Sequence, residues 1–381
     1  MSTKPLHIMM LGLRGFPRVQ GGVENHVENL SQELIALGCK VTAVVRSRYQ
    51  QKEARTRWNG IAVRGIWSPP SSHLEAIVHT FLGILYAATV RPDILHIHAI
   101  GPALMTPLAR TLGLRVVVTH HGEDYNRQKW GLAAKCILKL GEHVGMRYAH
   151  ARIVISKGIL ASVAQKFGIT CEEIANGVTL PDLTSQGLIL KKFGITPRRY
   201  VLLVSRFVPE KRHTDLIAAF LAANLPGWKL ALVGTADHHN AYSAMVLAAA
   251  RRSPDIVCTG FLSGQELHDM YLHAGMFVLP SSHEGLPISI LEAMSYGLPV
   301  IASDIQANRE IAGPAIDYFP VGDIDALTQL LKKNAAIQFE SALCEQIRDI
   351  IRSHYSWRDI ASKTFSVYQS AKRATQVAVR T

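Results

Sequence analysis

The sequence predicts an α/β protein built from two doubly wound domains, each a parallel sheet with helices on both faces. A chain of 381 residues is too long for a single hydrophobic core. Its composition, 48% apolar and 18% charged, is that of a globular protein and not of a disordered one. Short apolar runs also alternate with segments of helical periodicity, which is the pattern of a parallel sheet with crossover helices.

The first half of the chain is expected to hold five short buried strands with helices between them. The apolar runs that predict strands are residues 6–11, 40–45, 94–97, 116–119 and 153–156. Apolar residues at helical spacing predict helices over 24–37, 76–90 and 104–112. Gly38 and Gly113 follow two of these helices, in the place where glycine commonly ends a helix.

The second half repeats this alternation with a new set of elements. Its expected strands are residues 200–205, 229–233, 256–258, 276–279 and 299–302. Its expected helices are residues 215–223, 242–251, 265–274 and one that begins near Leu286. Residues 176–197 are rich in turn-forming residues, so we expect an N-terminal domain of residues 1–180 and a second domain of residues 181–356. Such sheets bind ligands at the carboxyl ends of their strands.

Charge and cysteine usage narrow the class of protein further. Lys and Arg outnumber Asp and Glu by 21 to 11 in residues 1–180, but only by 20 to 18 in residues 181–381. A basic first half predicts an anionic partner such as a membrane surface, a lipid diphosphate or an acidic glycan. The five cysteines lack metal-ligand or redox spacing, so we expect buried free thiols in a reducing compartment. No signal-peptide pattern is visible, and the longest apolar stretch is short for a bilayer span.

The most informative stretch is residues 280–294, where an apolar strand leads through Pro-Ser-Ser-His-Glu-Gly into an apolar helix. A helix start offers unpaired backbone N–H groups and the positive end of the helix dipole, which together favour phosphate. Glu284 precedes this helix and Glu292 lies within it. Carboxylates beside a phosphate site are expected to bind neutral hydroxyls. The pattern therefore indicates a ligand that joins a diphosphate to sugars.

Two other strand ends carry candidate ligand-binding residues. The loop of residues 12–24 contains Gly21-Gly22, which lets the backbone approach a ligand closely. This loop lacks the dinucleotide-binding and P-loop fingerprints. Arg206 and Lys211 follow the first strand of the second half, where their charges can neutralise a leaving diphosphate.

These motifs together resemble the GT4 family of retaining glycosyltransferases. Glu284 and Glu292, eight positions apart, are similar to the Glu-x7-Glu signature of that family. The Gly-Gly-x-Glu loop at 21–24 and the string at 206–211 are similar to two further family motifs. The resemblance implies the GT-B fold, two doubly wound Rossmann-like domains facing a central cleft. It also implies that the last helix, at 357–381, crosses back to the N-terminal domain.

The resemblance implies a role for each candidate residue of the second domain. Glu284 would bind hydroxyls of the donor sugar, and Glu292 would bind those of the ribose. Arg206 and Lys211 would hold the diphosphate. The other expected donor contacts are glycines and helix-start residues: Gly21, Gly22, Gly234, Gly285, Leu286 and Pro287.

A histidine of the first domain is also implied. In the string 119–124, His121 would line the cleft near the donor sugar, with His120 as the alternative. With Glu284, Arg206 and Lys211, this histidine completes the implied catalytic set. The adjacent string 123–130 resembles a subgroup of bacterial polysaccharide transferases, which suggests a role in capsule, exopolysaccharide or lipopolysaccharide assembly.

Two sequence patterns could suggest a metal, but neither is expected to bind one. His96 and His98 alternate on a strand with no third ligand near them in the sequence. Asp323-Ile324-Asp325 spells Asp-x-Asp, and Asp323 is expected to serve as a helix N-cap instead. We expect no essential metal and no cofactor, the nucleotide sugar being a substrate.

The expected reaction is transfer of a hexose from a nucleotide-diphosphate sugar, with UDP as the first choice. The expected acceptor is a glycan or a lipid-linked glycan in bacterial surface polysaccharide biosynthesis, at the cytoplasmic face of the membrane. One alternative is a sugar-nucleotide epimerase of the same shape, which would need additional acid/base carboxylates. A non-catalytic glycan- or nucleic-acid-binding protein is the alternative that charge alone motivates, although no nucleic-acid-binding module is recognisable and nucleic acid is not expected as a partner.

Overall fold

The computed structural model describes residues 4–50, 56–71, 74–127, 130–185, 187–236, 240–311, 313, 316–337 and 341–378. Contacts divide the chain into two compact units. The first comprises Met1–Gly177 and Trp357–Thr381, and the second comprises Val178–Ser356. The domain boundary expected from the sequence, between residues 180 and 181, lies a few residues further along the chain.

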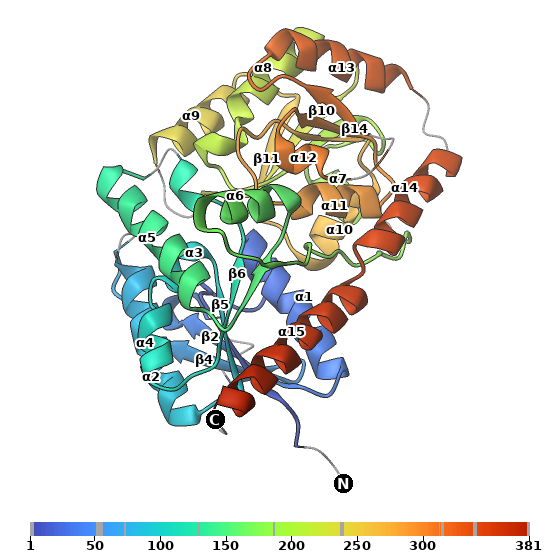
Figure 1. Ribbon diagram of the computed structural model, residues 1–381. Helices are drawn as coiled ribbons and strands as arrows, with labels where there is room; N and C mark the ends of the chain where they lie inside the picture. Colours follow the sequence, from blue (N-terminus) through green and yellow to red (C-terminus); the bar gives the residue numbers. More distant parts are fainter. Residues whose placement is uncertain are drawn as a thin grey trace. The chain divides into compact units, whose positions relative to one another are not determined.

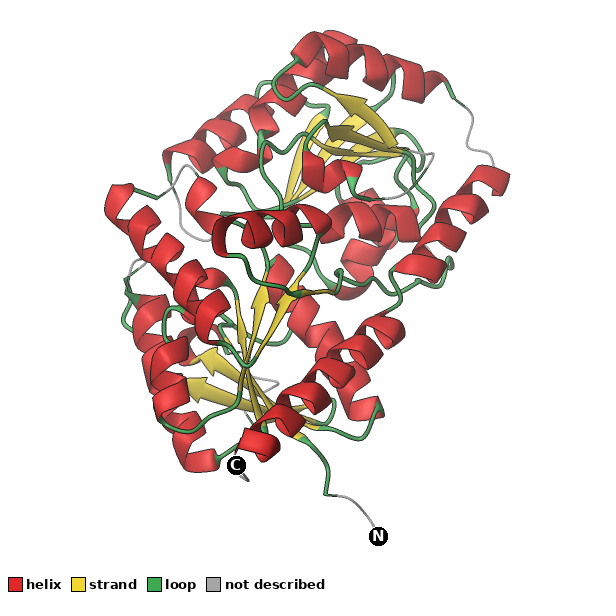
Figure 2. Cartoon of the chain, viewed as in Figure 1, coloured by secondary structure: helices red, strands yellow, loops and turns green. Residues whose placement is uncertain are grey.

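The first unit is built on an eight-stranded sheet (Figures 1 and 2). From edge to edge its strands are β3 (Arg57–Trp58), β4 (Ile61–Ile66), β2 (Lys40–Arg46), β1 (His7–Leu11), β5 (Ile94–His98), β6 (Val116–His120), β7 (Ala151–Val154) and β8 (Glu172–Glu173). All neighbouring strands are parallel except β3 and β4. The chain proceeds outward from β1 to β2 and β4, then returns to place β5 on the other side of β1. The strand order therefore reverses between β1 and β5, and such a switch point is where these sheets form ligand sites.

Helices cover both faces of this sheet. They are α1 (Gly22–Ala36), α2 (Glu75–Val90), α3 (Ile100–Ala103), α4 (Thr106–Thr111), α5 (Leu132–Tyr148), α6 (Lys157–Phe167) and α15 (Trp357–Ala378). The C-terminal helix α15 runs beside α1, whereas α2, α3, α4 and α5 contact one another (Figure 1). Leu30 and Leu34 of α1, Ile8 and Met10 of β1, and Tyr368 of α15 share one hydrophobic core.

The second unit is built on a six-stranded sheet, entirely parallel. Its strands in spatial order are β11 (Ile256–Gly260), β10 (Lys229–Val233), β9 (Tyr200–Val204), β12 (Met276–Leu279), β13 (Val300–Ser303) and β14 (Ile316–Phe319). Its helices are α7 (Leu188–Lys192), α8 (His213–Ala223), α9 (Ala241–Ala250), α10 (Gly264–Leu272), α11 (Ile288–Ser295), α12 (Gln306–Arg309), α13 (Ile324–Ala336) and α14 (Ser341–His354). Here the order reverses between β9 and β12. Both sheets thus confirm the predicted doubly wound α/β class.

Several expected boundaries were wrong, each for a local reason. The helix expected at 104–112 begins at Thr106, because Pro107 lacks an amide hydrogen and is best accommodated in a first turn. The strand expected at 153–156 is β7, Ala151–Val154, since the Ser156 hydroxyl accepts from Ile159 N and caps α6 instead. The expected N-cap at Asp323 is confirmed, because its carboxylate accepts from Ala326 N at 2.8 Å.

The five cysteines are all free, but the expectation that they are buried was largely wrong. Cys39 is buried, whereas Cys136 is exposed on α5. The other three cysteines are half-buried. Within the described parts of the chain, no helix combines the length and the apolar character needed to cross a membrane.

Candidate functional site

The switch point of the second unit brings together a cation and a carboxylate predicted from sequence. The loop after β9 contains η4 (Pro209–Lys211), and the loop after the neighbouring strand β12 contains Glu284. Lys211 Nζ forms an ion pair with Glu284 Oε1, and their side chains are 17% and 12% exposed. Ser282 N donates to Glu210 O at 2.9 Å, which ties the two loops to each other. Arg206, half-buried, lies in the same loop after β9.

The helix that follows Glu284 starts later than expected. We placed its start at Leu286, but α11 begins at Ile288 with Pro287 as N-cap. Leu286 is buried in the preceding turn, where it anchors the loop, and the amide-free Pro287 holds the extended backbone that precedes the helix. In the described α11, the first turn carries no acidic side chain, so the positive end of its dipole is not offset there. The half-buried Gly285 belongs to this turn.

Glu292 is held by a tyrosine that sequence reasoning missed. Tyr271 Oη, on α10, donates to Glu292 Oε2 at 2.8 Å. Burial first, and the Glu292 charge second, raise the pKa of Tyr271 well above its ordinary value, so the phenol keeps its proton and acts as donor. The Tyr271 ring stacks on Tyr296 with centroids 5.3 Å apart. The carboxylate is therefore oriented by a rigid aromatic pair.

Gly234 lies at the carboxyl end of β10, next to the loop that carries Arg206. Its backbone N donates to Gly260 O at 2.8 Å, which joins the ends of β10 and β11. Ser205 N donates to Val233 O at 3.0 Å and so aligns the end of β9 with the end of β10. The predicted residues Arg206, Lys211, Gly234 and Glu284 therefore share one edge of the second sheet.

In the first unit, the two expected glycines form the start of α1. Gly21 is the N-cap, with a φ of 156°, and Gly22 is the first helical residue. A Cβ added to Gly22 would meet nothing within 4 Å, so open space adjoins this helix start. Glu24 in the first turn is already engaged, because Arg14 N donates to Glu24 Oε1 at 3.1 Å.

The predicted histidine, His121, is half-buried and lies against two buried histidines, His26 and His98. His121 Nε2 lies 3.0 Å from Nδ1 of His98, the last residue of β5. His26 of α1 packs edge-on against the His121 ring, with centroids 4.9 Å apart. Burial lowers the pKa of His26 to about 4 and those of His98 and His121 well below their ordinary value, so all three rings are neutral at pH 7.

The alternative candidate, His120, has a different environment. It is fully buried, and its Nε2 pairs with Glu142 Oε1 of α5 at 3.0 Å. Gly122 N donates to its Nδ1 at 3.1 Å, so both ring nitrogens are used within the fold. His96, the other strand histidine, likewise bonds Thr119 Oγ1 at 2.6 Å and Tyr368 Oη at 2.7 Å. In the neighbouring string 123–130, Gln128 and Lys129 lie outside the described residues.

Sequence reasoning found no third histidine for the His96–His98 pattern, yet the fold supplies one for His98. One ring nitrogen from each of His26, His98 and His121 lies within 4.8 Å of the other two, a grouping able to hold a metal ion. His26 escaped notice because it is on α1, far away in sequence. The expectation of no metal stays a prediction.

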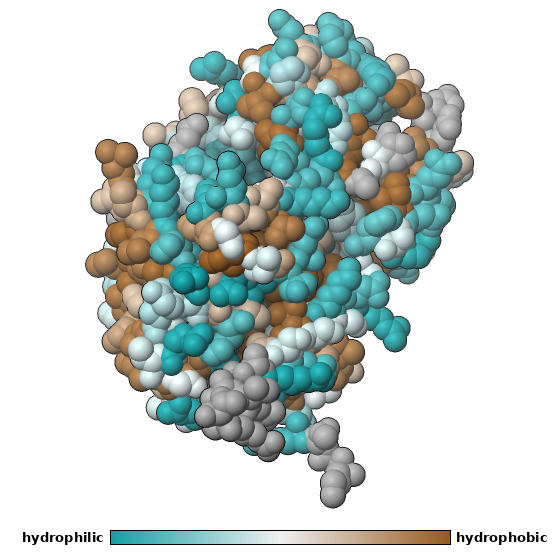
Figure 3. All heavy atoms as spheres, in the orientation of Figure 1, coloured by the Kyte–Doolittle hydropathy of each residue, from teal (hydrophilic) through white to brown (hydrophobic). Residues whose placement is uncertain are grey.

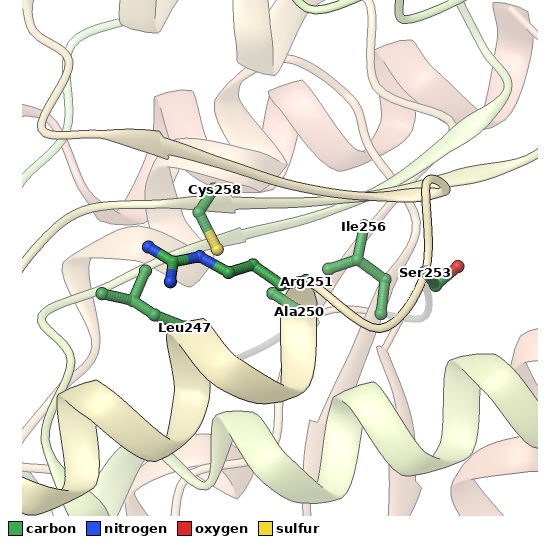
Figure 4. Close-up of a pocket in the computed structure, with 6 residues that line it drawn as sticks. All are labelled: Leu247, Ala250, Arg251, Ser253, Ile256 and Cys258. Carbon is green, nitrogen blue, oxygen red and sulfur yellow. The ribbon is translucent and has the colours of Figure 1, made fainter.

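A pocket of about 310 Å³ lies away from these residues (Figure 4). Its lining comes from the end of α9, the following turn and the edge strand β11: Leu247, Ala250, Arg251, Ser253, Ile256 and Cys258. None of the predicted site residues lines it. It is therefore separate from the candidate site.

Comparison with known proteins identifies the family. The sequence model of "Glycosyl transferases group 1" matches residues 186–349, and that of "Glycosyltransferase Family 4" matches residues 20–180. The two models together span most of both structural units. The chain therefore belongs to the group 1, family 4 glycosyltransferases.

Individual relatives agree with this assignment. The chain is 25% identical, over 84% of its length and 87% of the relative's, to a GDP-mannose-dependent α-(1-6)-phosphatidylinositol monomannoside mannosyltransferase of Mycolicibacterium smegmatis. It is also 25% identical, over 97% of both chains, to a GDP-mannose:cellobiosyl-diphosphopolyprenol α-mannosyltransferase of Xanthomonas oryzae pv. oryzae. Among solved structures, sucrose-phosphate synthase from Thermosynechococcus elongatus superposes with a TM-score of 0.80 at 19% identity, covering 97% of this chain and 100% of that one. The fold is GT-B.

Proposed function

We propose that this glycosyltransferase moves a hexose from a nucleotide-diphosphate sugar to a glycan or lipid-linked acceptor, with retention of configuration and without a catalytic metal. The Lys211–Glu284 pair at the switch point of the second sheet carries the proposal. It sets a cation for phosphate beside a carboxylate for sugar hydroxyls, next to the start of α11. An epimerase would need additional acid/base carboxylates, which the Glu-x7-Glu string does not provide.

Each proposed role follows from the chemistry of the side chain. Arg206 and Lys211 neutralise the diphosphate as it leaves. Glu284 accepts hydrogen bonds from donor-sugar hydroxyls, and Glu292, oriented by Tyr271, accepts them from the ribose. The contacts expected from sequence at Gly21, Gly22, Gly234, Gly285, Leu286, Pro287 and His121 stay predictions.

The proposed chemistry needs no enzymic nucleophile. The bond between the anomeric carbon and the phosphate oxygen breaks as the acceptor oxygen bonds to the same face of the sugar. The acceptor proton passes to the departing phosphate oxygen. In this scheme the protein binds, orients and stabilises charge, so removing Arg206 or Lys211 should lower kcat more than it raises the KM for donor.

For the donor, we propose GDP-mannose as the first candidate to test. Two relatives are named as GDP-mannose-dependent enzymes, and they align with 84% and 97% of this chain. The sequence-based choice of a UDP-sugar stays a prediction. A thermal-shift screen of GDP-mannose against UDP-, ADP- and dTDP-sugars separates them, because a bound donor stabilises the folded protein by mass action.

We propose a membrane-anchored acceptor at the cytoplasmic face, in surface polysaccharide assembly. One relative is named for a diphosphopolyprenol acceptor. Apolar side chains on α5 are exposed, namely Leu132 (85%), Ile137 (42%) and Leu140 (52%), with Lys135 and Lys139 on the same helix. Brown, apolar side chains gather on the left of the first unit in Figure 3, where Figure 1 shows α2, α4 and α5. Exposed apolar and basic residues on one helix favour contact with an anionic membrane surface.

Donor hydrolysis tests the proposal. We expect slow release of nucleoside diphosphate from the preferred sugar nucleotide, and loss of that release in Glu284→Ala and Arg206→Ala. The matched control is Asp317→Ala, because Asp317 forms a surface ion pair with Lys333 in the same unit. Interconversion of sugar epimers without release would favour the epimerase. Tight polynucleotide binding without turnover would favour the non-catalytic alternative.

A further inference from the structure

Three histidines of the first unit converge from three elements. His26 lies on α1, His98 ends β5, and His121 follows β6. One ring nitrogen of each lies within 4.8 Å of the corresponding nitrogen of both others. The closest pair is His98 Nδ1 and His121 Nε2, at 3.0 Å. No carboxylate belongs to this group of described residues.

The surroundings of His26 fix which of its nitrogens faces outward to a ligand. Its Nδ1 donates to Asn176 Oδ1 at 3.0 Å, which leaves the lone pair on Nε2. A metal-ligating histidine characteristically donates its other ring N–H to an oxygen in this way. Trp357 packs edge-on against the ring, with centroids 5.4 Å apart, and restricts its rotation.

His98 offers its Nδ1 to the group, because that nitrogen faces His121. The residue is fully buried, and among the described residues its Nε2 has no hydrogen-bond partner. Whichever nitrogen carries the proton, the ring keeps an unsatisfied polar atom in the interior, which costs about 1–3 kcal/mol. When an ion takes the lone pair of Nδ1, the proton lies on Nε2, which still has no partner among the described residues.

We propose that His26, His98 and His121 bind one transition-metal ion of the zinc class, with a fourth coordination position open. Three imidazoles and no carboxylate suit Zn²⁺, Ni²⁺ or Cu²⁺ and disfavour Mg²⁺ and Ca²⁺. A tetrahedral ion at about 2.0–2.1 Å from each nitrogen separates the nitrogens by about 3.3 Å. The His98–His121 pair is already near that separation, and the His26 nitrogen lies within 4.8 Å of both.

This ion would inhibit donor binding and would not be required for catalysis. Here the inference rests on the proposed function, which assigns His121 to the donor sugar. A ring that ligates an ion cannot also bond a sugar hydroxyl at the same nitrogen. If the donor sugar uses Nε2 of His121, the nitrogen that faces His98, ion and donor weaken each other's binding by the same factor.

Calorimetric titration with ZnCl₂, and visible absorption with Co²⁺, test the site directly. The protein should carry no affinity tag, and His238→Ala and His239→Ala should be present throughout, because adjacent histidines bind transition metals by themselves. We expect one ion per chain with tetrahedral Co²⁺ absorption. His26→Ala and His98→Ala should weaken binding at least about 100-fold, and Asn176→Ala about 10- to 100-fold. His143→Ala, an exposed histidine on α5, is the matched control and should bind as the parent does.

Absence of a one-to-one site, or a site that His26→Ala and Asn176→Ala leave unchanged, overturns the proposal. Circular dichroism of each variant shows whether a loss of binding reflects unfolding, and Asn176→Ala tests the site without removing a ligand. Donor titration with and without Zn²⁺ then measures the competition. If Zn²⁺ binds but no donor does, the metal site stands and the proposed function fails.

Discussion

A double-mutant cycle on Lys211 and Glu284 tests whether their ion pair does what its position indicates. Glu284→Gln would leave the Lys211 ammonium in a largely enclosed position without its carboxylate. Lys211→Met would leave the Glu284 carboxylate there without its ammonium. The two side chains are only 17% and 12% exposed. Breaking a buried pair costs about 3–5 kcal/mol, whereas an exposed pair contributes about 0–1 kcal/mol. This intermediate pair should cost about 2 kcal/mol when either partner is removed.

The double variant should cost no more than either single change, because it leaves no unpaired charge. That corresponds to a coupling free energy of about 2 kcal/mol. Urea denaturation measures it, since for m near 2 kcal/mol per M each single variant lowers the midpoint of the second unit by about 1 M. Donor hydrolysis should be lost in all three variants, because both side chains are proposed to contact the donor.

The Lys333–Asp317 pair is the control for this cycle. Its side chains are 57% and 31% exposed, so its coupling should fall below about 1 kcal/mol. Additive effects of the Lys211 and Glu284 changes, within about 0.5 kcal/mol, would refute the energetic reasoning. Recovery of hydrolysis in the double variant would refute the proposed donor contacts.

Three further predictions concern the surroundings of the site. Gly177→Ala should lower the thermal midpoint through overpacking of about 1–3 kcal/mol, because the new Cβ would come within 2.5 Å of the Trp357 ring; an unchanged midpoint contradicts this. Tyr271→Phe removes the hydrogen bond to Glu292 and should lower the free energy of unfolding by about 1 kcal/mol. It should also raise the KM for the sugar nucleotide with little change in kcat. Kinetics equal to those of the parent would contradict the proposed role of Tyr271. Burial, then the nearby Lys211 charge, lowers the pKa of His213 to about 3, below the unfolded value of 6.5. The contribution of neutral His213 to the free energy of unfolding is thus complete above pH 6.5 and falls by about 1.4 kcal/mol per pH unit below it. Urea midpoints that stay constant from pH 7 to pH 5 would contradict this prediction.

Most strands of both sheets were predictable from sequence because strands buried on both faces appear as nearly continuous apolar runs, but β3, β4, β8 and β14 were not predicted. The expected strand at 229–233 coincides with β10, and that at 276–279 with β12. The relation between Lys211 and Glu284 follows from topology as well, since both residues come after strands that flank the switch point. Local sequence therefore sufficed where burial and strand order dictated the outcome.

Helix α5 shows where local sequence did not suffice. Two glycines, Gly141 and Gly145, lower its helical propensity, and it was not predicted. In the structure these glycines permit close packing of α5 on α3. A Cβ at Gly141 would lie 2.3 Å from Ile100 O, and one at Gly145 would lie 2.6 Å from Ala103 Cβ. The close approach of α5 to α3 thus accounts for its two glycines, and this tertiary contact is not visible in the sequence of α5 alone.

The same limit applies to the site. Tyr271 and His26 were missed because each acts through a partner that is distant in sequence, Glu292 in one case and Asn176 in the other. The start of α11 at Ile288 instead of Leu286 has a local cause, namely Pro287. Pro287 is itself the N-cap and has extended backbone, so the first helical residue is Ile288.

The first half of the chain combines an excess of basic residues with a neutral histidine cluster. Residues 1–180 hold 21 basic against 11 acidic residues, yet the histidine cluster at the end of its strands is neutral because burial suppresses protonation. Neutral imidazoles suit hydroxyls or a metal ion and do not neutralise a diphosphate. The histidine cluster therefore does not account for the anionic partner that the basic excess predicts. The lysines of α5, beside exposed Leu132 and Leu140, support the proposed contact with an anionic and partly apolar surface. Charge reversal at Lys135 and Lys139 should accordingly weaken vesicle binding while leaving donor hydrolysis in solution unchanged.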